Sequence, residues 1–167
     1  MKKFWLLLLA LIVFLCACGG EGVMQKQTAS PEQTEKAEGI APEAAQPQAA
    51  LLIEVNGSRF YAVPADSEAA ESLVEKLSSE PITVELQDYG SFEKVGALPW
   101  TLPQSDTSIT TVPGDIMLYR GDQIMIFYGE NTWEYTPLAH IERSAEELAS
   151  AFGEGGVSVT LSVEWSE

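Results

Sequence analysis

The alternation of apolar and polar residues predicts a mainly β-structure for the C-terminal part of the chain, residues 51–167. In Val157–Trp165, Val, Leu and Trp alternate with Ser, Thr and Glu, as in a strand with one buried face. Ile82–Leu86 alternates in the same way. Asp115–Tyr119 and Gln123–Tyr128 are nearly continuous apolar runs joined by a Gly-Asp turn. We therefore expect these two strands to lie centrally, with both faces covered.

The Asn56-Gly57 dipeptide predicts a β-hairpin at the start of this region. It separates two apolar segments, Leu51–Val55 and Arg59–Val63. Asn-Gly between such segments is typical of a type I′ turn, in which both central residues need a positive φ. We therefore expect the two segments to pair as antiparallel strands.

Two short helices are predicted among the strands. Asp66 or Ser67 is placed to cap a helix that carries one apolar stripe. Ser144 and Glu147 have the spacing of a capping box, and Gly153 is placed to end the helix that follows. Seven or eight short strands with two short helices favour a closed β-barrel whose ends the helices cover.

The N-terminal segment has the pattern of a signal peptide. Lys occupies positions 2 and 3, and an unbroken apolar run of 14 residues extends from Phe4 to Ala17. A helix of that length is too short to cross a bilayer, which takes about 20 residues. Residues 1–17 are therefore expected to direct export and to be removed.

Cys18 is the predicted site of lipid attachment. Residues 15–19 (LCACG) resemble the bacterial lipobox, in which an aliphatic residue and then a small residue precede the modified Cys. Ala17 satisfies the second position for Cys18, whereas Cys16 follows the bulky Leu15 and fits poorly. The alternative is an ordinary signal peptide with two incidental Cys residues. A lipidated N-terminus would anchor the protein, because each buried methylene contributes about 0.8 kcal/mol.

Residues 18–50 are predicted to form a disordered tether, and the folded domain is expected to span residues 51–167. From Gly19 to Ala50 the sequence has no Phe, Trp or Tyr and is rich in Ala, Gln, Glu and Pro. Such a composition buries too little apolar surface to offset the entropy cost of ordering. We expect the tether to hold the domain away from the membrane surface.

The charge of the chain argues against nucleic acid as a partner. The sequence has 25 Asp and Glu residues against 9 Lys and Arg, a net charge of −16, whereas phosphate backbones are bound by clustered Lys and Arg. The sequence contains no phosphate-binding Gly loop, and its one His, His140, has no neighbours at metal-ligand spacing. We therefore expect no cofactor and no metal.

Six segments between about Leu51 and Trp165 carry a family resemblance, with consistent order and spacing. They are Ile82–Gly90 (ITVELQDYG), Phe92–Gly96 (FEKVG), Leu98-Pro99, Pro113–Tyr119 (PGDIMLY), Ile126–Gly129 (IFYG) and Trp133–Leu138 (WEYTPL). The chain thereby resembles the small bacterial cyclophilin-like proteins. The resemblance implies a closed eight-stranded antiparallel β-barrel with a helix near each end, as in the prolyl isomerases called cyclophilins. The function of this family is largely unassigned.

The resemblance does not bring isomerase activity with it, because fold alone does not carry function. The catalytic cyclophilins use an Arg guanidinium beside an apolar pocket, marked by Phe-His-Arg and Gln-Gly-Gly-Asp sequences, and neither string occurs here. None of Arg59, Arg120 and Arg143 has the expected neighbours. An isomerase or folding factor with a non-standard active site is the alternative to a non-catalytic binding protein.

The aromatic and charged residues of the matching segments are the candidates for a ligand site, and no catalytic residue is assigned. They are Tyr89, Phe92, Glu93, Lys94, Trp100, Tyr128, Trp133, Tyr135 and His140. Many are expected in loops or at strand ends, where binding groups gather on a rigid scaffold. The alternative is structural: Tyr128 and Trp133 would fill the barrel, and Glu93 and Lys94 would form a solvated turn.

Together these features predict a bacterial lipoprotein on the extracytoplasmic face of the cell membrane. Its barrel is expected to bind a peptide or a small ligand without catalysing a reaction. The expected partners are that ligand and the membrane, which the protein contacts through the lipid on Cys18.

Overall fold

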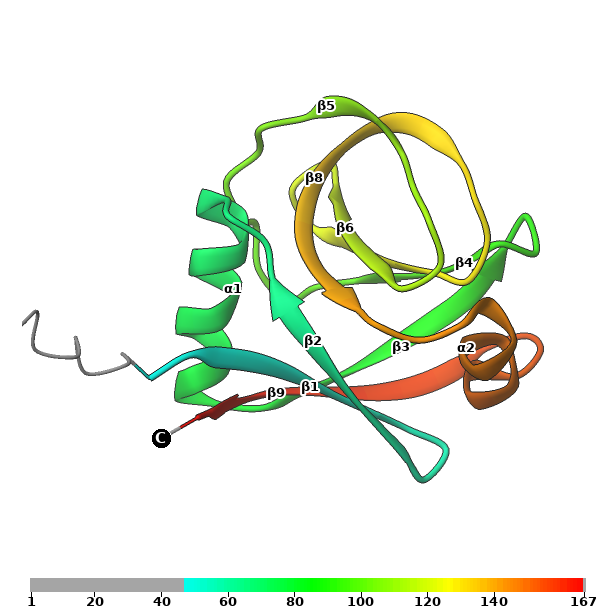
Figure 1. Cartoon of the computed structure of the whole chain (residues 1–167). Coiled ribbons are helices and arrows are strands. Elements are labelled where there is room, and N and C mark those ends of the chain that lie inside the picture. The colour runs from blue at the N-terminus through cyan, green and yellow to red at the C-terminus, as the bar shows by residue number, and fades with distance from the viewer. Residues whose placement is uncertain (1–46, 167) are drawn as a thin grey trace, which may run out of the picture. The chain divides into compact units, whose positions relative to one another are not determined.

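The computed structural model describes residues 47–166, which form nine β-strands and two α-helices (Figure 1). The strands are β1 (Ala49–Val55), β2 (Ser58–Pro64), β3 (Ile82–Tyr89), β4 (Glu93–Ala97), β5 (Thr107–Thr110), β6 (Asp115–Tyr119), β7 (Gln123–Phe127), β8 (Thr132–Ile141) and β9 (Val157–Trp165). The helices are α1 (Glu68–Ser79) and α2 (Ala145–Phe152). The predicted signal peptide, Cys18 and the tether as far as residue 46 lie outside the described residues. Within residues 47–166, neither helix is long and apolar enough to span a bilayer.

Eight of the nine strands close into an antiparallel barrel. Their order around it is β2-β1-β9-β3-β4-β7-β6-β8, and β8 returns to β2 by pairing Ala62 with Ile141 and Val63 with His140. The ninth strand, β5, pairs with β8 on the outside of the barrel. The predicted closed eight-stranded barrel with two short helices is therefore confirmed, with one strand added to it.

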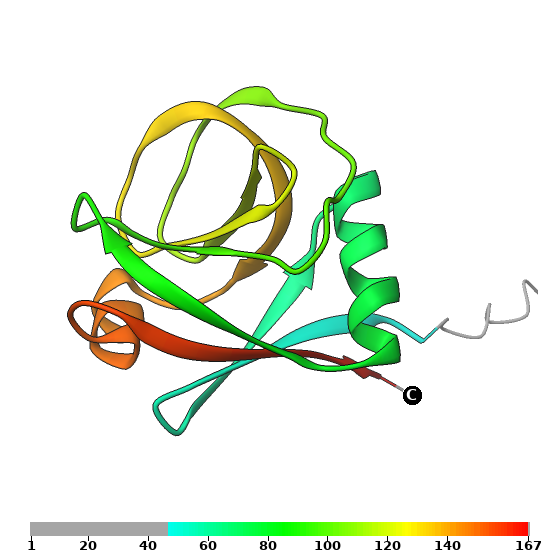
Figure 2. The ribbon, with the colours of Figure 1, turned by 180° about the vertical axis from the view of Figure 1, so that it is seen from behind.

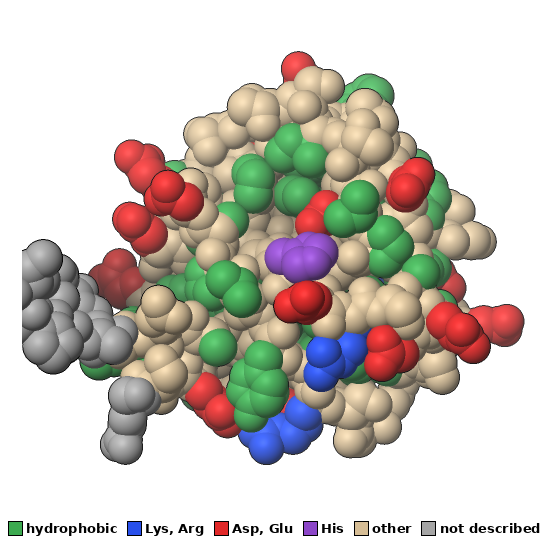
Figure 3. Space-filling model, in the orientation of Figure 1, with side chains coloured by type: hydrophobic (Ala, Val, Ile, Leu, Met, Phe, Trp, Pro, Cys, Tyr) green, Lys and Arg blue, Asp and Glu red, His purple; other side chains and the backbone are tan. Residues whose placement is uncertain are grey.

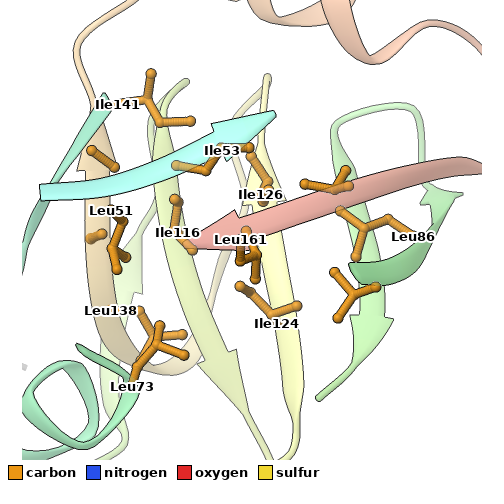
Figure 4. Packing of buried hydrophobic residues seen from close by; sticks show 14 of the residues in the cluster. Leu51, Ile53, Leu73, Leu86, Ile116, Ile124, Ile126, Leu138, Ile141 and Leu161 are labelled. Carbon is orange, nitrogen blue, oxygen red and sulfur yellow. The ribbon is translucent and has the colours of Figure 1, made fainter. Parts of the chain in front are cut away.

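Aliphatic side chains from facing strands fill the barrel (Figure 4). Ile53 of β1 lies opposite Ile116 of β6 and Ile126 of β7, and all three are fully buried. Met117, Met125 and Phe127, which alternate with the core residues of β6 and β7, are also buried, but on the outer surface of the barrel. Both faces of these two strands are thus covered, as their continuous apolar sequences predict.

Both helices begin at the predicted caps. Ser67, rather than Asp66, caps α1, and its side-chain oxygen accepts a 3.1 Å hydrogen bond from the backbone N–H of Ala70. Ser144 and Glu147 form the predicted capping box of α2. The two helices lie on opposite sides of the barrel in both views (Figures 1 and 2).

Strand β1 begins at Ala49, two residues before the position from which the sequence predicts it. Ala49 and Ala50 belong to β1, where they pair with Trp165 and Glu164 of β9. Their backbone groups are satisfied by this ladder, so the strand does not depend on large apolar side chains at its first two positions. The composition of the predicted tether therefore concealed the start of the strand.

Strand β8 carries a β-bulge that the sequence pattern did not predict. Ile116 pairs with Ala139 and Met117 pairs with Pro137, so Leu138 has no partner opposite it on β6. As a result Leu138 and Ala139, although adjacent, both belong to the barrel core. A Pro is tolerated in this strand because it lies beside the bulge, where the ladder is already interrupted.

Candidate functional site

A ribbon made of β5 and the first half of β8 covers the outer surface of β4, β7 and β6. Its register pairs Thr107 with Tyr135 and Ile109 with Trp133. Beneath it lies a second apolar cluster, separate from the barrel core and built from outward-facing side chains. The buried members of this cluster are Met117, Met125, Phe127 and Tyr135. The barrel wall is therefore packed on both surfaces at this place.

A pocket of about 840 Å³ opens beside the second cluster. Ligand pockets typically measure about 300–1,000 Å³, so its size suits a small molecule or a side chain of a peptide. We name it the Glu93 pocket, and it is lined by Tyr89, Gly90, Phe92, Glu93, Val95, Tyr119, Gln123, Met125, Asn131, Trp133 and Tyr135. Tyr89 and Trp133 are 65% and 57% exposed, so their rings are accessible from solvent.

The aromatic rings of the pocket and the cluster below it contact one another in a chain. Tyr135 meets Phe127 edge to face at 5.5 Å between ring centroids, and Tyr119 meets Tyr135 at 6.4 Å. Phe92 stacks on Phe127 at 6.4 Å, and Tyr89 meets the edge of Phe92 at 6.3 Å. Such pairs favour defined ring orientations, so the walls of the pocket are fixed before any ligand arrives.

The turn between β3 and β4 depends on Gly90 to place the Phe92 ring. Tyr89 pairs with Glu93, so three residues form the connection. Gly90 has a φ of 59°, which favours glycine, and a Cβ atom added there would collide with the Phe92 ring. A side chain at Gly90 would therefore push one wall of the pocket out of place.

Strand alternation turns Glu93 toward the pocket and Lys94 toward the barrel interior. Glu93 pairs with Phe127 of the outer cluster, whereas Lys94 pairs with Ile126 of the core. The two side chains are buried, at 1% and 0% exposed. The alternative prediction, a solvated turn at these residues, is wrong because both belong to β4 and are covered by other strands.

Glu93 has no partner for its buried carboxylate oxygen. Its Oε2 atom makes no hydrogen bond to any of the described residues. Burial raises the pKa of Glu93 from 4.5 to about 7. The hydroxyls of Tyr128 and Tyr135, near enough for electrostatic interaction with Glu93, have pKa values raised mainly by burial and remain neutral. No Lys, Arg or His is among the residues that line the pocket, so none of them supplies a positive charge to offset Glu93.

Lys94 is fully paired and belongs to a different part of the molecule. Its Nζ atom donates to the carbonyl oxygens of Gly153 at 2.7 Å and Gly155 at 2.9 Å and lies 3.1 Å from an Asp88 carboxylate oxygen. Tyr128 donates its hydroxyl to the same carboxylate, and this hydrogen bond is the largest cause that lowers the pKa of Asp88. Lys94 therefore joins β4 to the loop between α2 and β9 and does not line the pocket.

Trp100 and Tyr128 also lie outside the Glu93 pocket. Both are partly buried against the barrel core, as the structural alternative predicted for Tyr128. The Lys76 ammonium group lies 5.5 Å from the centre of the Trp100 ring. Trp133, by contrast, does not fill the barrel as that alternative supposed, because it projects from the ribbon and is more than half exposed.

His140 occupies a separate, shallow depression. Its Nδ1 atom lies 2.8 Å from an Asp115 carboxylate oxygen, and Ser144 and Glu147 line the same depression of about 480 Å³. Figure 3 shows the histidine near the centre of this face, with acidic side chains mostly toward the edges. The structure therefore separates His140 from the aromatic candidates.

The structure thus brings together five of the predicted site residues: Tyr89, Phe92, Glu93, Trp133 and Tyr135. The pocket residues that the sequence did not indicate are Gly90, Val95, Tyr119, Gln123, Met125 and Asn131. Tyr119 and Met125 belong to strands that are apolar on both faces, so nothing in the sequence distinguished their outward side chains from core residues. The alternation of side chains along a strand at Glu93–Val95 was the available signal, because it places Glu93 and Lys94 on opposite faces of the sheet.

The chain belongs to the cyclophilin-like family, whose model matches residues 53–164. A solved structure of a hypothetical protein from Archaeoglobus fulgidus is similar to it, with a TM-score of 0.52 and 15% sequence identity. The match covers 73% of this chain and 98% of that one, and at this identity it shows the fold alone. No curated protein matches the chain. The comparisons therefore support the fold of the barrel. Any function of the pocket has to be inferred from the residues that line it.

We expect Glu93→Gln to stabilise the protein increasingly as pH rises. In the unfolded chain the carboxyl ionises near pH 4.5, whereas in the folded protein it keeps its proton to about pH 7. As pH rises from about 4.5 to about 7, the free energy of unfolding therefore falls, and it does not recover at higher pH. The total loss is at most about 3 kcal/mol. Urea unfolding should show that the gain from Gln is larger at about pH 8 than at about pH 4 by up to that amount.

Glu134→Gln is the matched control, because Glu134 is exposed on strand β8. It removes a carboxylate that is exposed rather than buried. Its effect on the free energy of unfolding should therefore change little over the same pH range. A Glu93→Gln effect of equal size at both pH values would contradict the burial of an unpaired carboxyl at this position.

Proposed function

We propose that the protein binds a small organic molecule or a peptide side chain in the Glu93 pocket and does not catalyse a reaction. The observation that carries the proposal is the combination of fixed aromatic walls with one buried, unpartnered carboxyl group. Buried polar groups in folded proteins nearly always have hydrogen-bond partners, so an unpaired one in an open pocket indicates that a ligand supplies the partner.

The exposed aromatic residues of the pocket support the same function. Tyr89 and Trp133 expose large rings where a structural role would bury them. Aromatic side chains contribute strongly to binding because they offer much contact area and lose little conformational entropy. A ligand that enters the pocket would cover these rings and contact Glu93 at the same time.

We further propose that Cys18 is lipidated and anchors the protein to the extracytoplasmic face of a bacterial cell membrane. The support is the sequence of residues 15–19, in which Ala17 precedes Cys18 as the lipobox requires. The predicted tether between Cys18 and the folded domain would then give the binding domain access to molecules outside the cell.

A prolyl isomerase or folding factor is the second candidate, and one contact favours it. The Arg120 guanidinium lies 5.1 Å from the centre of the Tyr119 ring, and Tyr119 lines the Glu93 pocket. A guanidinium beside an apolar pocket is the arrangement that the catalytic cyclophilins use, although the sequence around Arg120 is different. Arg59 fits this role less well, because it pairs with Glu54 at 3.2 Å and Glu164 at 3.0 Å.

Replacement of Trp133 by Ala should weaken ligand binding by at least about tenfold, the effect of losing about 1.4 kcal/mol. The test is a ligand-observed NMR screen of the full chain in detergent against uncharged aromatic and aliphatic fragments and charged ones. Trp165→Ala is the matched control, because Trp165 is 54% exposed but lies outside the pocket. A screen without any binder, or binders that both variants retain, would contradict a ligand site here.

Cys18→Ser should abolish processing and lipid attachment when the full chain is expressed in bacteria. Mass spectrometry of the membrane fraction is expected to show a diacylglycerol-modified N-terminus at Cys18 in the wild type. Cys16→Ser, two residues away, should leave that modification intact and serves as the control. An unmodified thiol, or a mature N-terminus downstream of Cys18, would exclude the anchor.

Isomerase activity is expected to be absent. NMR exchange measurements on a proline-containing tetrapeptide such as Ala-Ala-Pro-Phe should give the uncatalysed rate, which corresponds to tens to hundreds of seconds. A clear acceleration that Arg120→Ala removes and Arg59→Ala preserves would instead establish the second candidate.

A further inference from the structure

The charges around the Glu93 pocket are unbalanced. Glu93 is the single charged residue among the eleven that line the pocket. Lys94, the nearest base in sequence, directs its ammonium group to Gly153 and Gly155 of the loop between α2 and β9 and to Asp88. Arg120 contacts Tyr119 but does not line the pocket. The chain as a whole carries a net charge of −16, which attracts cations and repels anions.

We propose that the ligand of the Glu93 pocket is an organic ammonium ion, whose positive charge pairs with the Glu93 carboxylate and lies against the aromatic walls. This inference rests on the proposed function that the pocket binds a ligand. An ammonium group donates the hydrogen bond that Oε2 lacks and supplies the positive charge that the pocket lacks. Below about pH 7 it would take the place of the proton that Glu93 retains in the empty pocket.

The aromatic residues of the pocket suit the same cation. Tyr89, Phe92, Tyr119, Trp133 and Tyr135 all line it. Aromatic faces attract ammonium groups through the negative potential above the ring, and Trp and Tyr do so more strongly than Phe. The alkyl or aryl part of an organic ammonium ion would cover Val95 and Met125, which are the apolar lining.

A metal ion fits the pocket less well than an organic cation. Among residues 47–166 no three His, Cys, Asp or Glu side chains come together in a way that could hold one. Calcium takes about six to eight oxygen ligands, and one carboxylate supplies two. The volume of about 840 Å³ is likewise that of a site for an organic molecule.

A neutral ligand is the competing possibility. If Glu93 stayed protonated, its carboxyl would donate a hydrogen bond to a carbonyl or hydroxyl oxygen of an uncharged molecule. The two possibilities make opposite demands on the ligand: the first needs a positive charge, and the second needs an acceptor without one. Pairs of probes of equal shape and different charge therefore separate them.

The experiment is calorimetric titration of the full chain in detergent at about pH 8.5, where alkylammonium groups remain protonated. The first pair of probes is 2-phenylethylammonium and the uncharged 2-phenylethanol. The second pair is Nα-acetyl-lysinamide, which represents a lysine side chain of a peptide, and the uncharged Nα-acetyl-norleucinamide. We expect one ammonium probe, or both, to bind at least about tenfold more tightly than its neutral partner, and the pair that does so identifies a free amine or a lysine side chain as the source.

Glu93→Gln should reduce the affinity for the ammonium probe by at least about tenfold and leave that for the neutral probe within about twofold. Glu134→Gln, which removes one negative charge at an exposed position, should leave both affinities unchanged. Thermal unfolding of each variant verifies that it is folded, and Trp133→Ala tests the contribution of the rings without altering the carboxylate.

Equal binding of charged and neutral probes, or an ammonium affinity that Glu93→Gln does not change, would overturn the inference. It would also fall if neither ammonium probe bound. The proposed function would still stand in these cases if uncharged fragments bound in a Trp133-dependent manner. If no fragment and no probe bound, both the function and the inference would be wrong.

Discussion

The β-bulge in β8 is the feature that allows one strand to serve both the barrel and the pocket. The residues after the bulge pair with β2 and close the barrel, whereas Thr132–Tyr135 pair with β5 above its outer surface. Because the bulge inserts one residue, the alternation of side chains reverses along the strand. Tyr135 consequently faces the outer cluster while Ala139 and Ile141 face the core, although all three have the same parity. An unbroken strand would place the aromatic wall and the core residues on one face.

Glu93 and Lys94 show how differently the same fold treats two adjacent buried charges. Lys94 is a structural charge: its donors are satisfied by two carbonyls and a carboxylate, which offsets the cost of removing the ammonium from water. Glu93 is buried equally deeply, yet its Oε2 atom has no partner within the described residues. The pairing of Lys94 shows that this barrel can supply partners for a buried charged group. The missing partner of Glu93 is therefore a specific feature of its position.

The barrel followed from the sequence because its determinants are local: an Asn-Gly turn, capping residues such as Ser144, and alternation in β9. Only some of the residues of the Glu93 pocket could be predicted from the sequence. Strands that are apolar on both faces do not show which side chains point outward, so Tyr119 and Met125 were missed. The bulge at Leu138 depends on pairing between distant strands and has no local signal beyond the neighbouring proline. Lys94 was assigned to the site because its partners lie about sixty residues away in sequence and could not be anticipated.

If the pocket binds a ligand as proposed, the position of Glu93 would link the stability of the domain to the occupancy of that pocket. An unpaired carboxyl in a covered position destabilises the folded state, whereas Val95, on the same face of β4, is apolar and packs against the outer cluster. Functional sites in proteins often carry residues that lower the stability of the fold. A ligand that pairs with Glu93 removes the penalty and binds to the folded state alone, so its affinity appears directly as added stability. The destabilisation that the unpaired carboxyl causes in the empty pocket would therefore contribute to the binding free energy of such a ligand.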